Sequence, residues 1–437
     1  MSQAVPVIAP LRALRYREQA GSLSSLLAPP FDVISTEEQA WLYQQHEHNI
    51  VRLEYAMSYP GDTPQGNCYT RAAATLRQWR EEGVLAQDER PALYPYRHSF
   101  TFQGERRQRL GCFCLVRLSE FSQGVVLPHE DTHSEAKADR RQLLRACQAQ
   151  ISPIFSLFRE GRQEASAILG KALGEEPIAR AELGQERHEL WQIADPTLIR
   201  RFAAVLGAGP FFIADGHHRY ETALAFRDEM RQAHPEAGEL AAYNYALMML
   251  VAMDDPGLVI LPATRMLKLG ARPLALLQEA AAEYFQVQAV ALVPGAIAPR
   301  LEARSASGQP AFAIVTAQGS LLLTLKPTVE LPRDPRGRLE VSVLHALLLD
   351  GVLAASRERQ LSYAMGELEP CRMVESGRYD AAVFLNAPGA EQVLEVACAG
   401  QRMPHKSTYF YPKPATGLVI SPISAQERAG LPENGRA

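Results

Sequence analysis

Residues 210–232 read PFFIADGHHRYETALAFRDEMRQ, and this stretch decides the expected fold. The apolar run Pro210 to Ala214 predicts a short buried strand, and the pattern of Glu221 to Gln232 predicts a helix. Leu198 to Leu206 also has helical periodicity, so the order of elements is helix, strand, loop, helix. The loop Asp215 to Arg219 is therefore expected at the carboxyl end of a strand, where open α/β sheets commonly hold ligands.

The loop Asp215-Gly216-His217-His218-Arg219 has the residue types of an anion-binding site. Gly216 lets the backbone approach a ligand closely, and the amides that follow it open a helix whose amino end is partially positive. Arg219 can add a bidentate contact to phosphate, and the rings of His217 and His218 supply further donors. The alternative is that Asp215 only caps the helix. We favour a phosphate site, because clustered polar groups after a short apolar strand are unusual for packing alone.

Outside this stretch, the alternation of Tyr94 to Phe102 and of Arg106 to Leu118 predicts an antiparallel hairpin. The Glu- and Ala-rich sequence from Gly161 to Leu190 is expected to be an inserted helical or loop region. The fold class is α+β or mixed α/β. We expect three domains, namely a helical and loop region at 1–92, a core at 93–260 with the insertion near 161–190, and an α/β region at 261–437.

Other polar residues are candidates for the same chemistry. Glu130, in the run Pro128-His129-Glu130-Asp131, is a candidate general base, and a solvated turn explains its position equally well. Lys406 and Ser407 lie in a basic, aromatic stretch that either holds a second phosphate or forms an exposed loop.

Three further residues are candidates for binding substrate: Asp32, which follows Pro29-Pro30, Arg52, and His129 beside Glu130. Charged groups inside apolar runs need partners, which is why Asp32 and Arg52 are expected to line a pocket. An ordinary ion pair with Glu54 explains Arg52 equally well.

Composition excludes several classes of protein. The chain has 437 residues, of which 47% are hydrophobic and 22% charged, as in ordinary globular proteins. A net charge of −4 gives no general attraction to nucleic acid. The longest apolar run, Leu240 to Met253, is too short to span a bilayer, and the start lacks the features of a secretory signal, so we expect a cytoplasmic protein.

The six cysteines are scattered, and none forms a CxxC pair. Their distribution argues against a disulfide framework or a structural zinc site. Cys112 and Cys114 are two residues apart in a strand-like stretch, so both are expected to face one side of a sheet and pack in the core.

The motifs Asp215-Gly216-His217-His218-Arg219-Tyr220 and Pro128-His129-Glu130 resemble those of free-serine kinases of the ParB/sulfiredoxin superfamily. The resemblance implies a ParB/sulfiredoxin-like core with large helical and β-containing additions. It also implies that Glu130 and Asp215 are catalytic and that Gly216, His217, His218 and Arg219 bind the transferred phosphate.

Over its whole length the chain also resembles a prokaryotic family that carries only an unknown-function label. The shared features are APPFDVI at 28–34, DGHHRYETA at 215–223 and KSTYFYPK at 406–413.

These features predict a kinase that phosphorylates a small hydroxyl compound, serine first, with magnesium and with ATP, ADP or pyrophosphate as the donor. The chain has no GxxxxGK[ST] loop, which excludes a P-loop kinase. One alternative is a metal-dependent phosphohydrolase or nuclease with Asp215, His217 and His218 as ligands. Another is a protein that binds nucleotide or phosphate without catalysis. Neither nucleic acid nor membrane is an expected partner, and the sequence leaves the oligomeric state open.

Overall fold

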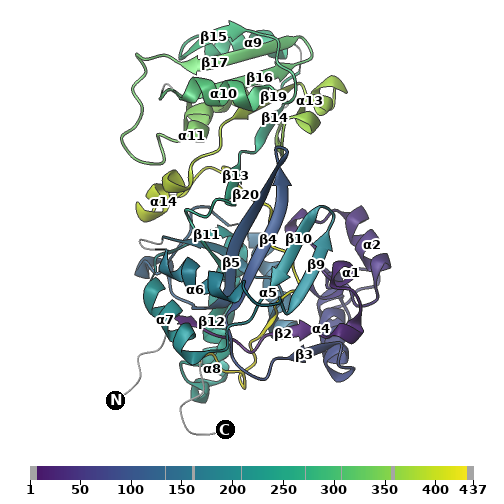
Figure 1. The fold of residues 1–437 in the computed structure, drawn as a ribbon. Coiled ribbons are helices and arrows are strands. Elements are labelled where there is room, and N and C mark those ends of the chain that lie inside the picture. The colour runs from purple at the N-terminus through teal and green to yellow at the C-terminus, as the bar shows by residue number, and fades with distance from the viewer. Residues whose placement is uncertain are drawn as a thin grey trace. The chain divides into compact units, whose positions relative to one another are not determined.

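The computed structural model describes residues 7–132, 134–159, 163–207, 209–270, 272–306, 308–355 and 360–430. The chain forms two compact units (Figure 1). The first unit contains Met1–Pro128, Thr132–Leu258 and Pro412–Ala437, and the second contains His129–Asp131 and Val259–Tyr411. Each of the three domains expected from the sequence is one continuous segment, whereas each of these units is made of separate segments of the chain. The three-domain division stays a prediction.

The strands of the first unit are β1 (Ile8–Ala9), β2 (Leu14–Tyr16), β3 (Leu85–Gln87), β4 (Tyr94–Phe102), β5 (Glu105–Arg117), β6 (Val126–Leu127), β7 (Ala149–Gln150), β8 (Ile154–Phe158), β9 (Ala179–Leu183), β10 (Glu186–Leu190), β11 (Phe211–Asp215), β12 (Tyr245–Ala252) and β21 (Ser421–Pro422). Nine of these form one mixed sheet, with the order β6-β11-β8-β12-β5-β4-β10-β9 and with β1 paired to β5. Within it, β6 is parallel to β11 and β8 is parallel to β12. The small pairs β2-β3 and β7-β21 complete the unit.

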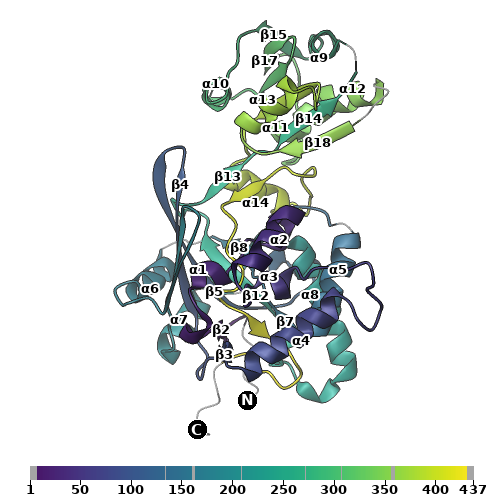
Figure 2. The same ribbon diagram turned by 90° about the vertical axis from the view of Figure 1, so that its right-hand side faces the viewer.

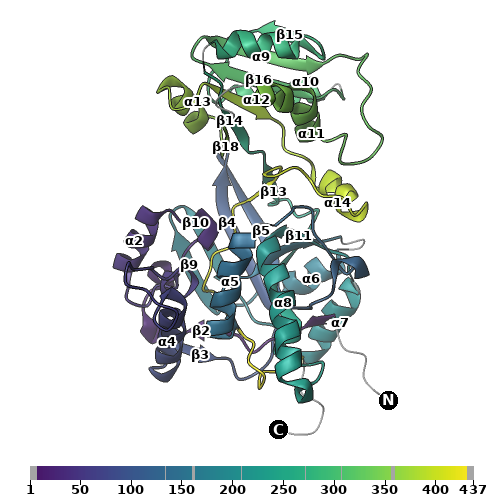
Figure 3. The same ribbon diagram turned by 180° about the vertical axis from the view of Figure 1, so that it is seen from behind.

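The helices of the first unit are α1 (Leu23–Leu26), α2 (Thr36–Gln45), α3 (Val51–Glu54), α4 (Cys68–Glu81), α5 (Ser134–Cys147), α6 (Glu164–Ala172), α7 (Pro196–Leu206) and α8 (His217–Ala233), with short 3-10 turns η1 (Glu18–Ala20), η2 (Phe31–Val33), η3 (Phe121–Gln123), η4 (Pro235–Ala237) and η5 (Ala242–Asn244). Helices α6 and α7 lie on one side of the sheet, and α4, α5 and α8 lie on the other (Figure 2). Figure 3 shows α5 and α8 side by side.

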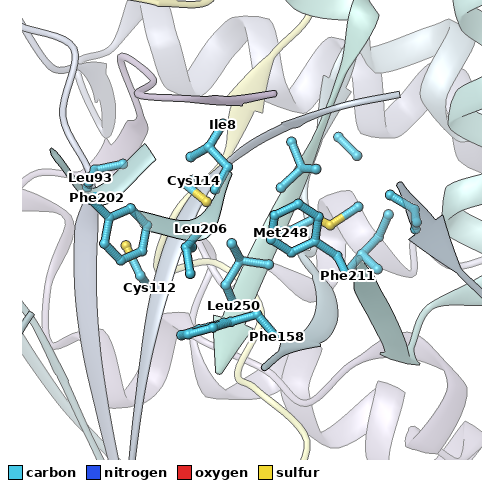
Figure 4. Packing of buried hydrophobic residues seen from close by; sticks show 14 of the residues in the cluster. Ile8, Leu93, Cys112, Cys114, Phe158, Phe202, Leu206, Phe211, Met248 and Leu250 are labelled. Carbon is cyan, nitrogen blue, oxygen red and sulfur yellow. The ribbon is translucent and has the colours of Figure 1, made fainter. Parts of the chain in front are cut away.

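A buried apolar cluster joins residues of the sheet with residues of α6, α7 and α8. Cys112 and Cys114 point into it from β5, together with Met248 and Leu250 of the neighbouring strand β12 (Figure 4). The prediction that both cysteines face one side of a sheet and pack in the core is therefore confirmed. All residues of β12 are buried, as expected for the centre of a sheet that is covered on both faces.

The predicted hairpin at Tyr94 to Phe102 and Arg106 to Leu118 is present as β4 and β5. The description of Gly161 to Leu190 as a helical or loop region is wrong in its second half, because β9 and β10 form a hairpin there and β10 pairs with β4. Strand β10 is short and carries polar side chains, so its sequence lacks the apolar alternation that identifies a strand. Gly161 and Arg162 lie outside the described residues.

The second unit has a sheet with the order β15-β17-β16-β19-β14-β18 and a separate pair, β13-β20. Its strands are β13 (Val259–Leu261), β14 (Thr264–Lys268), β15 (Phe285–Ala289), β16 (Ala311–Thr316), β17 (Gly319–Leu325), β18 (Gln360–Ala364), β19 (Ala381–Leu385) and β20 (Tyr409–Tyr411). Its helices are α9 (Pro273–Ala281), α10 (Ile297–Ser305), α11 (Glu340–Leu344), the π-helical turn η6 (His345–Leu349), α12 (Asp350–Ala355), α13 (Leu368–Glu375) and α14 (Ala390–Cys398).

Each face of the second sheet has its own apolar core. Residues of α9, α11 and α14 pack on one face, and residues of α10 and α13 pack on the other. The two units together confirm the predicted α+β, mixed α/β class. In the part of the chain that the structure describes, no helix has the length and apolar character needed to cross a bilayer.

Candidate functional site

The loop predicted to bind phosphate lies at the carboxyl end of β11, as expected. Asp215 is the last residue of β11, and His217 is the first of α8. Gly216 between them has a φ of +99°, in the left-handed region that favours glycine. A Cβ atom at this position would lie 3.1 Å from Nε of Arg219, so glycine also leaves room for the arginine side chain.

The carboxylate of Asp215 joins two cations. One of its oxygens accepts a hydrogen bond from Arg219, one helical turn further along the chain. The other lies 2.6 Å from Nζ of Lys413. Arg219 also donates to the carbonyl oxygen of Pro153, directly before β8, and Lys413 also donates to Asp32 in η2. We call Asp32, Asp215, Arg219 and Lys413 the loop cluster.

The ion pairs of Asp215 with Arg219 and Lys413 are mostly buried, so water screens them only weakly. The side chains of Asp215, Arg219 and Lys413 are 16%, 10% and 9% exposed. Burial alone would raise the pKa of Asp215, but the charges of Lys413 and Arg219 outweigh it and hold the pKa well below its usual range. Burial would lower the pKa of Lys413, but Asp215 and Asp32 outweigh it and raise that pKa. Asp215 and Lys413 therefore both carry their charge at neutral pH.

A second ion pair lies behind Arg219. Glu54 is buried, and its carboxylate accepts hydrogen bonds from Ser152 (2.8 Å) and Arg140 (3.4 Å). Burial raises the pKa of Glu54 more than Arg140 and Arg219 lower it. The guanidinium of Arg140 stacks 3.9 Å from the ring centroid of Phe31, the neighbour of Asp32.

A small cavity of about 40 Å³ opens beside Arg219 and this second pair. Leu143, Leu144, Ile151 and Ile154 supply much of its apolar lining. Arg219 of the loop cluster thus borders a small cavity in which apolar walls meet charged groups.

Lys413 is the residue of this cluster that the sequence analysis did not select. It ends the basic stretch in which Lys406 and Ser407 were chosen as phosphate ligands. In the sequence, Lys413 differs from Lys406 in that it follows Pro412 and the aromatic segment that forms β20. In the structure, Lys406 is exposed. The carbonyl of Pro412 accepts a hydrogen bond of 2.6 Å from the buried Arg109, which fixes the backbone beside Lys413.

Two of the predicted substrate-binding residues lie in the first unit, in different surroundings. Asp32 belongs to the loop cluster. Arg52 instead stacks 4.4 Å from the ring centroid of Tyr43 and donates to the Tyr43 carbonyl. The ion pair considered between Arg52 and Glu54 is replaced by the pair between Glu54 and Arg140.

The candidates outside the loop Asp215 to Arg219 that remain lie in the second unit. His129 is buried, and its Nε2 lies 2.9 Å from the hydroxyl of Thr408. The carboxylate of Glu130 lies 3.5 Å from Nδ1 of His405 and 3.4 Å from the backbone nitrogen of Lys406. Ser407 is buried and donates to the carbonyl of Pro404. Glu130 is therefore held by the loop that carries Lys406 and Ser407.

A family model described as "Protein of unknown function (DUF1015)" matches residues 8–346. This match confirms the expected resemblance to a family of unknown function. No curated protein matches the chain.

Among solved structures, a conserved hypothetical protein from Pyrococcus furiosus is 16% identical, with a TM-score of 0.33, covering 68% of this chain and 90% of its own. A free serine kinase in complex with AMP is 14% identical, with a TM-score of 0.35, covering 68% and 86%. SbnI from Staphylococcus aureus is 10% identical, with a TM-score of 0.37, covering 72% and 89%. Scores this low support no conclusion about the activity of this chain.

Proposed function

The chain belongs to the DUF1015 family. We propose that it is a cytoplasmic small-molecule kinase that phosphorylates a free hydroxyl compound, L-serine first. One observation carries the proposal: Arg219 and Lys413 meet at the amino end of α8, directly beside the glycine of the loop. Two cations, a glycine and the first amides of a long helix are the elements that bind a phosphoryl group.

The charges of the loop cluster are compatible with reversible binding of a phosphate. Arg219 and Lys413 are already balanced by Asp215 and Asp32, so the cluster holds no excess positive charge without a ligand. A phosphate would compete with the carboxylates for both cations. The cations would then stabilise the charge that spreads over the phosphoryl oxygens during transfer.

The carboxylates of Asp215 and Asp32 also fit a magnesium ion, because Mg²⁺ prefers hard oxygen ligands and usually takes one or two carboxylates. Both carboxylates contact the Lys413 ammonium, which occupies the point on which they converge, so magnesium binding there requires this lysine to move. Magnesium at these residues would offset the charge of ATP, ADP or pyrophosphate. Without magnesium, Asp215 orients Arg219 and Lys413.

Glu130 is proposed to orient the acceptor hydroxyl and take its proton, while the phosphoryl group passes from the donor oxygen to the hydroxyl oxygen. This assignment comes from the resemblance to free-serine kinases. The support from the second unit is that His405 and the Lys406 amide hold the carboxylate of Glu130 in a defined position. His129, His217, His218, Lys406 and Ser407 are proposed as further contacts to substrate or phosphate.

The test is an assay of the full chain with serine, magnesium and each of the three donors, with phosphoserine measured by mass spectrometry. We expect phosphoserine with one donor, and at least a 100-fold lower rate for Arg219→Met and for Glu130→Gln. Arg201→Met, which changes an exposed arginine of α7 that pairs with Glu164, is the matched control and should keep most of the rate.

Three outcomes decide between the proposal and its alternatives. No phosphorylated product with serine or with a panel of other hydroxyl compounds would overturn the kinase. Release of phosphate without an acceptor, together with a tightly held metal, would favour the phosphohydrolase. Unchanged nucleotide affinity in Glu130→Gln, with no turnover by the wild-type chain, would favour a binding protein.

A further inference from the structure

A row of polar side chains crosses the first sheet at a place that the proposed function does not use. His188 on β10 lies directly opposite His98 on β4, and His98 lies opposite Arg109 on β5. Glu186 is two residues before His188 on the same strand, so it points to the same face. The register of three strands therefore brings two imidazoles and one carboxylate together.

The ligand atoms of these side chains lie close to one another. One nitrogen of each histidine and one carboxylate oxygen of Glu186 are all within 4.8 Å of one another. Nε2 of His98 is 2.7 Å from Oε2 of Glu186, and Nε2 of His188 is 4.0 Å from the same oxygen. Zinc holds such ligands at about 2.0–2.2 Å, which puts ligand atoms roughly 3–3.5 Å apart. The two separations lie on either side of that range.

Burial makes this arrangement costly without a further partner. The side chains of His98 and His188 are 0% and 1% exposed. Nε2 of His188 is buried and has no hydrogen-bond partner among the described residues, although it lies 4.0 Å from Oε2 of Glu186. A buried polar atom without a partner costs about 1–3 kcal/mol and calls for an explanation such as a missing ion.

We propose that His98, Glu186 and His188 form a binding site for a divalent metal of the zinc class. Two imidazoles and a carboxylate are a common set of three protein ligands for zinc, which leaves a fourth position for water. The carboxylate of Glu186 is 28% exposed and gives the ion its route to the site. The ion would tie β10 to β4 and so fasten the outer hairpin to the sheet.

The neighbours of the site affect the two histidines differently. The hydroxyl of Tyr96 lies 2.6 Å from Nδ1 of His188, so an N–H at this nitrogen leaves Nε2 as the acceptor that a metal needs. Arg109 donates to Nδ1 of His98 over 3.1 Å, so without metal the proton of His98 is on Nε2, facing Glu186. Metal binding moves that proton to Nδ1 and breaks the hydrogen bond from Arg109. Arg109 keeps its contact with the Pro412 carbonyl.

The test uses untagged full-length protein, stripped of metal with a chelator and titrated with Co²⁺, whose visible absorption reports its ligands. Zn²⁺ is then added in competition. We expect one ion per chain, and at least about 100-fold weaker binding in Glu186→Gln and in His188→Gln, which each remove a ligand. Tyr96→Phe keeps every ligand and should weaken binding about 10-fold.

His234→Gln is the matched control, because His234 also pairs with a glutamate, Glu236, at 3.4 Å but on the surface. It should bind Co²⁺ as the wild type does. Zn²⁺ should also raise the melting temperature of the wild type and leave that of Glu186→Gln unchanged.

Failure of the wild type to bind Co²⁺, or equal affinity in the wild type and Glu186→Gln, would overturn the site. Should His188→Gln fail to fold, Glu186→Gln and Tyr96→Phe still decide, since one is partly exposed and the other changes no ligand. The readout is the spectrum of the ion, so the result is independent of kinase activity.

Discussion

The loop cluster and the row of polar side chains on β4, β5 and β10 belong to the same unit, but different interactions hold them together. The row consists of Tyr96, His98, Arg109, Glu186 and His188. In the loop cluster two carboxylates balance two cations. In the row, a carboxylate, two imidazoles, a tyrosine and an arginine meet through hydrogen bonds between strands. We therefore expect that removing one group from the loop cluster leaves a buried charge uncompensated, whereas removing the Tyr96 hydroxyl from the row breaks hydrogen bonds between neutral groups.

The largest effect is expected from Asp215→Asn, which removes the carboxylate shared by Arg219 and Lys413. Both cations would stay mostly buried with less compensation, and breaking such a pair costs about 3–5 kcal/mol. Urea unfolding followed by circular dichroism measures the loss. Asp254→Asn, at an exposed turn, should change the free energy of unfolding by less than about 0.5 kcal/mol. Equal effects of the two substitutions would contradict the charge balance.

The same pair predicts a dependence on pH. The pKa of Asp215 is lowered in the folded protein, so its stabilisation is present above the unfolded pKa of about 4 and is lost as pH falls towards the folded pKa. The difference in unfolding free energy between the wild type and Asp215→Asn should therefore shrink below about pH 4.

Glu54 provides a contrast of opposite sign. Because its folded pKa is raised, its contribution is present at low pH and lost as pH rises through that pKa. The wild type should therefore lose stability relative to Glu54→Gln as pH rises from about 4. Parallel curves for Asp215→Asn and Glu54→Gln would show that the two carboxyls do not differ in this way.

A smaller effect separates the two lysines of the basic stretch. Lys413→Met removes one of the two cations that contact Asp215 and should cost roughly 2 kcal/mol. Lys406 is exposed, so Lys406→Met should stay within about 0.5 kcal/mol. Thermal and urea unfolding of the two variants, side by side, give the comparison. A larger loss of unfolding free energy in Lys406→Met than in Lys413→Met would show that Lys413 does not have this structural role.

The smallest effect is expected in the row. Tyr96→Phe removes the hydrogen bond to Nδ1 of His188 and the one that the hydroxyl accepts from the Ala415 amide, and it keeps the ring in the core. Such bonds contribute about 1 kcal/mol each, so the loss is smaller than that expected for Asp215→Asn. Unfolding in the presence of a chelator measures the contribution of the Tyr96 hydroxyl to the free energy of unfolding separately from metal binding. A loss as large as that of Asp215→Asn would mean that the row, too, depends on charge.

The sequence predicts the loop well because its signals are local. Asp215 to Arg219 are consecutive residues, and the strand before them and the helix after them have clear periods. Lys413 is missed because its partner is almost two hundred residues away in the sequence, and periodicity does not identify which lysine of a basic stretch is buried. The row is missed for a similar reason. His98 and Glu186 meet only through the register of β4 with β10, and β10 itself has no apolar alternation.

The position of Lys413 in the sequence determines when the loop cluster can be completed during synthesis of the chain. The ribosome completes Asp32, Asp215 and Arg219, then the whole of residues 259–411, and only afterwards the lysine that joins the two carboxylates. A nascent chain therefore carries an incomplete cluster until the second unit has left the exit tunnel. A chain that ends before residue 413 would lack the ion pairs that join Asp32 in η2 to Asp215 in β11, and it would also lack β21 and its pairing with β7.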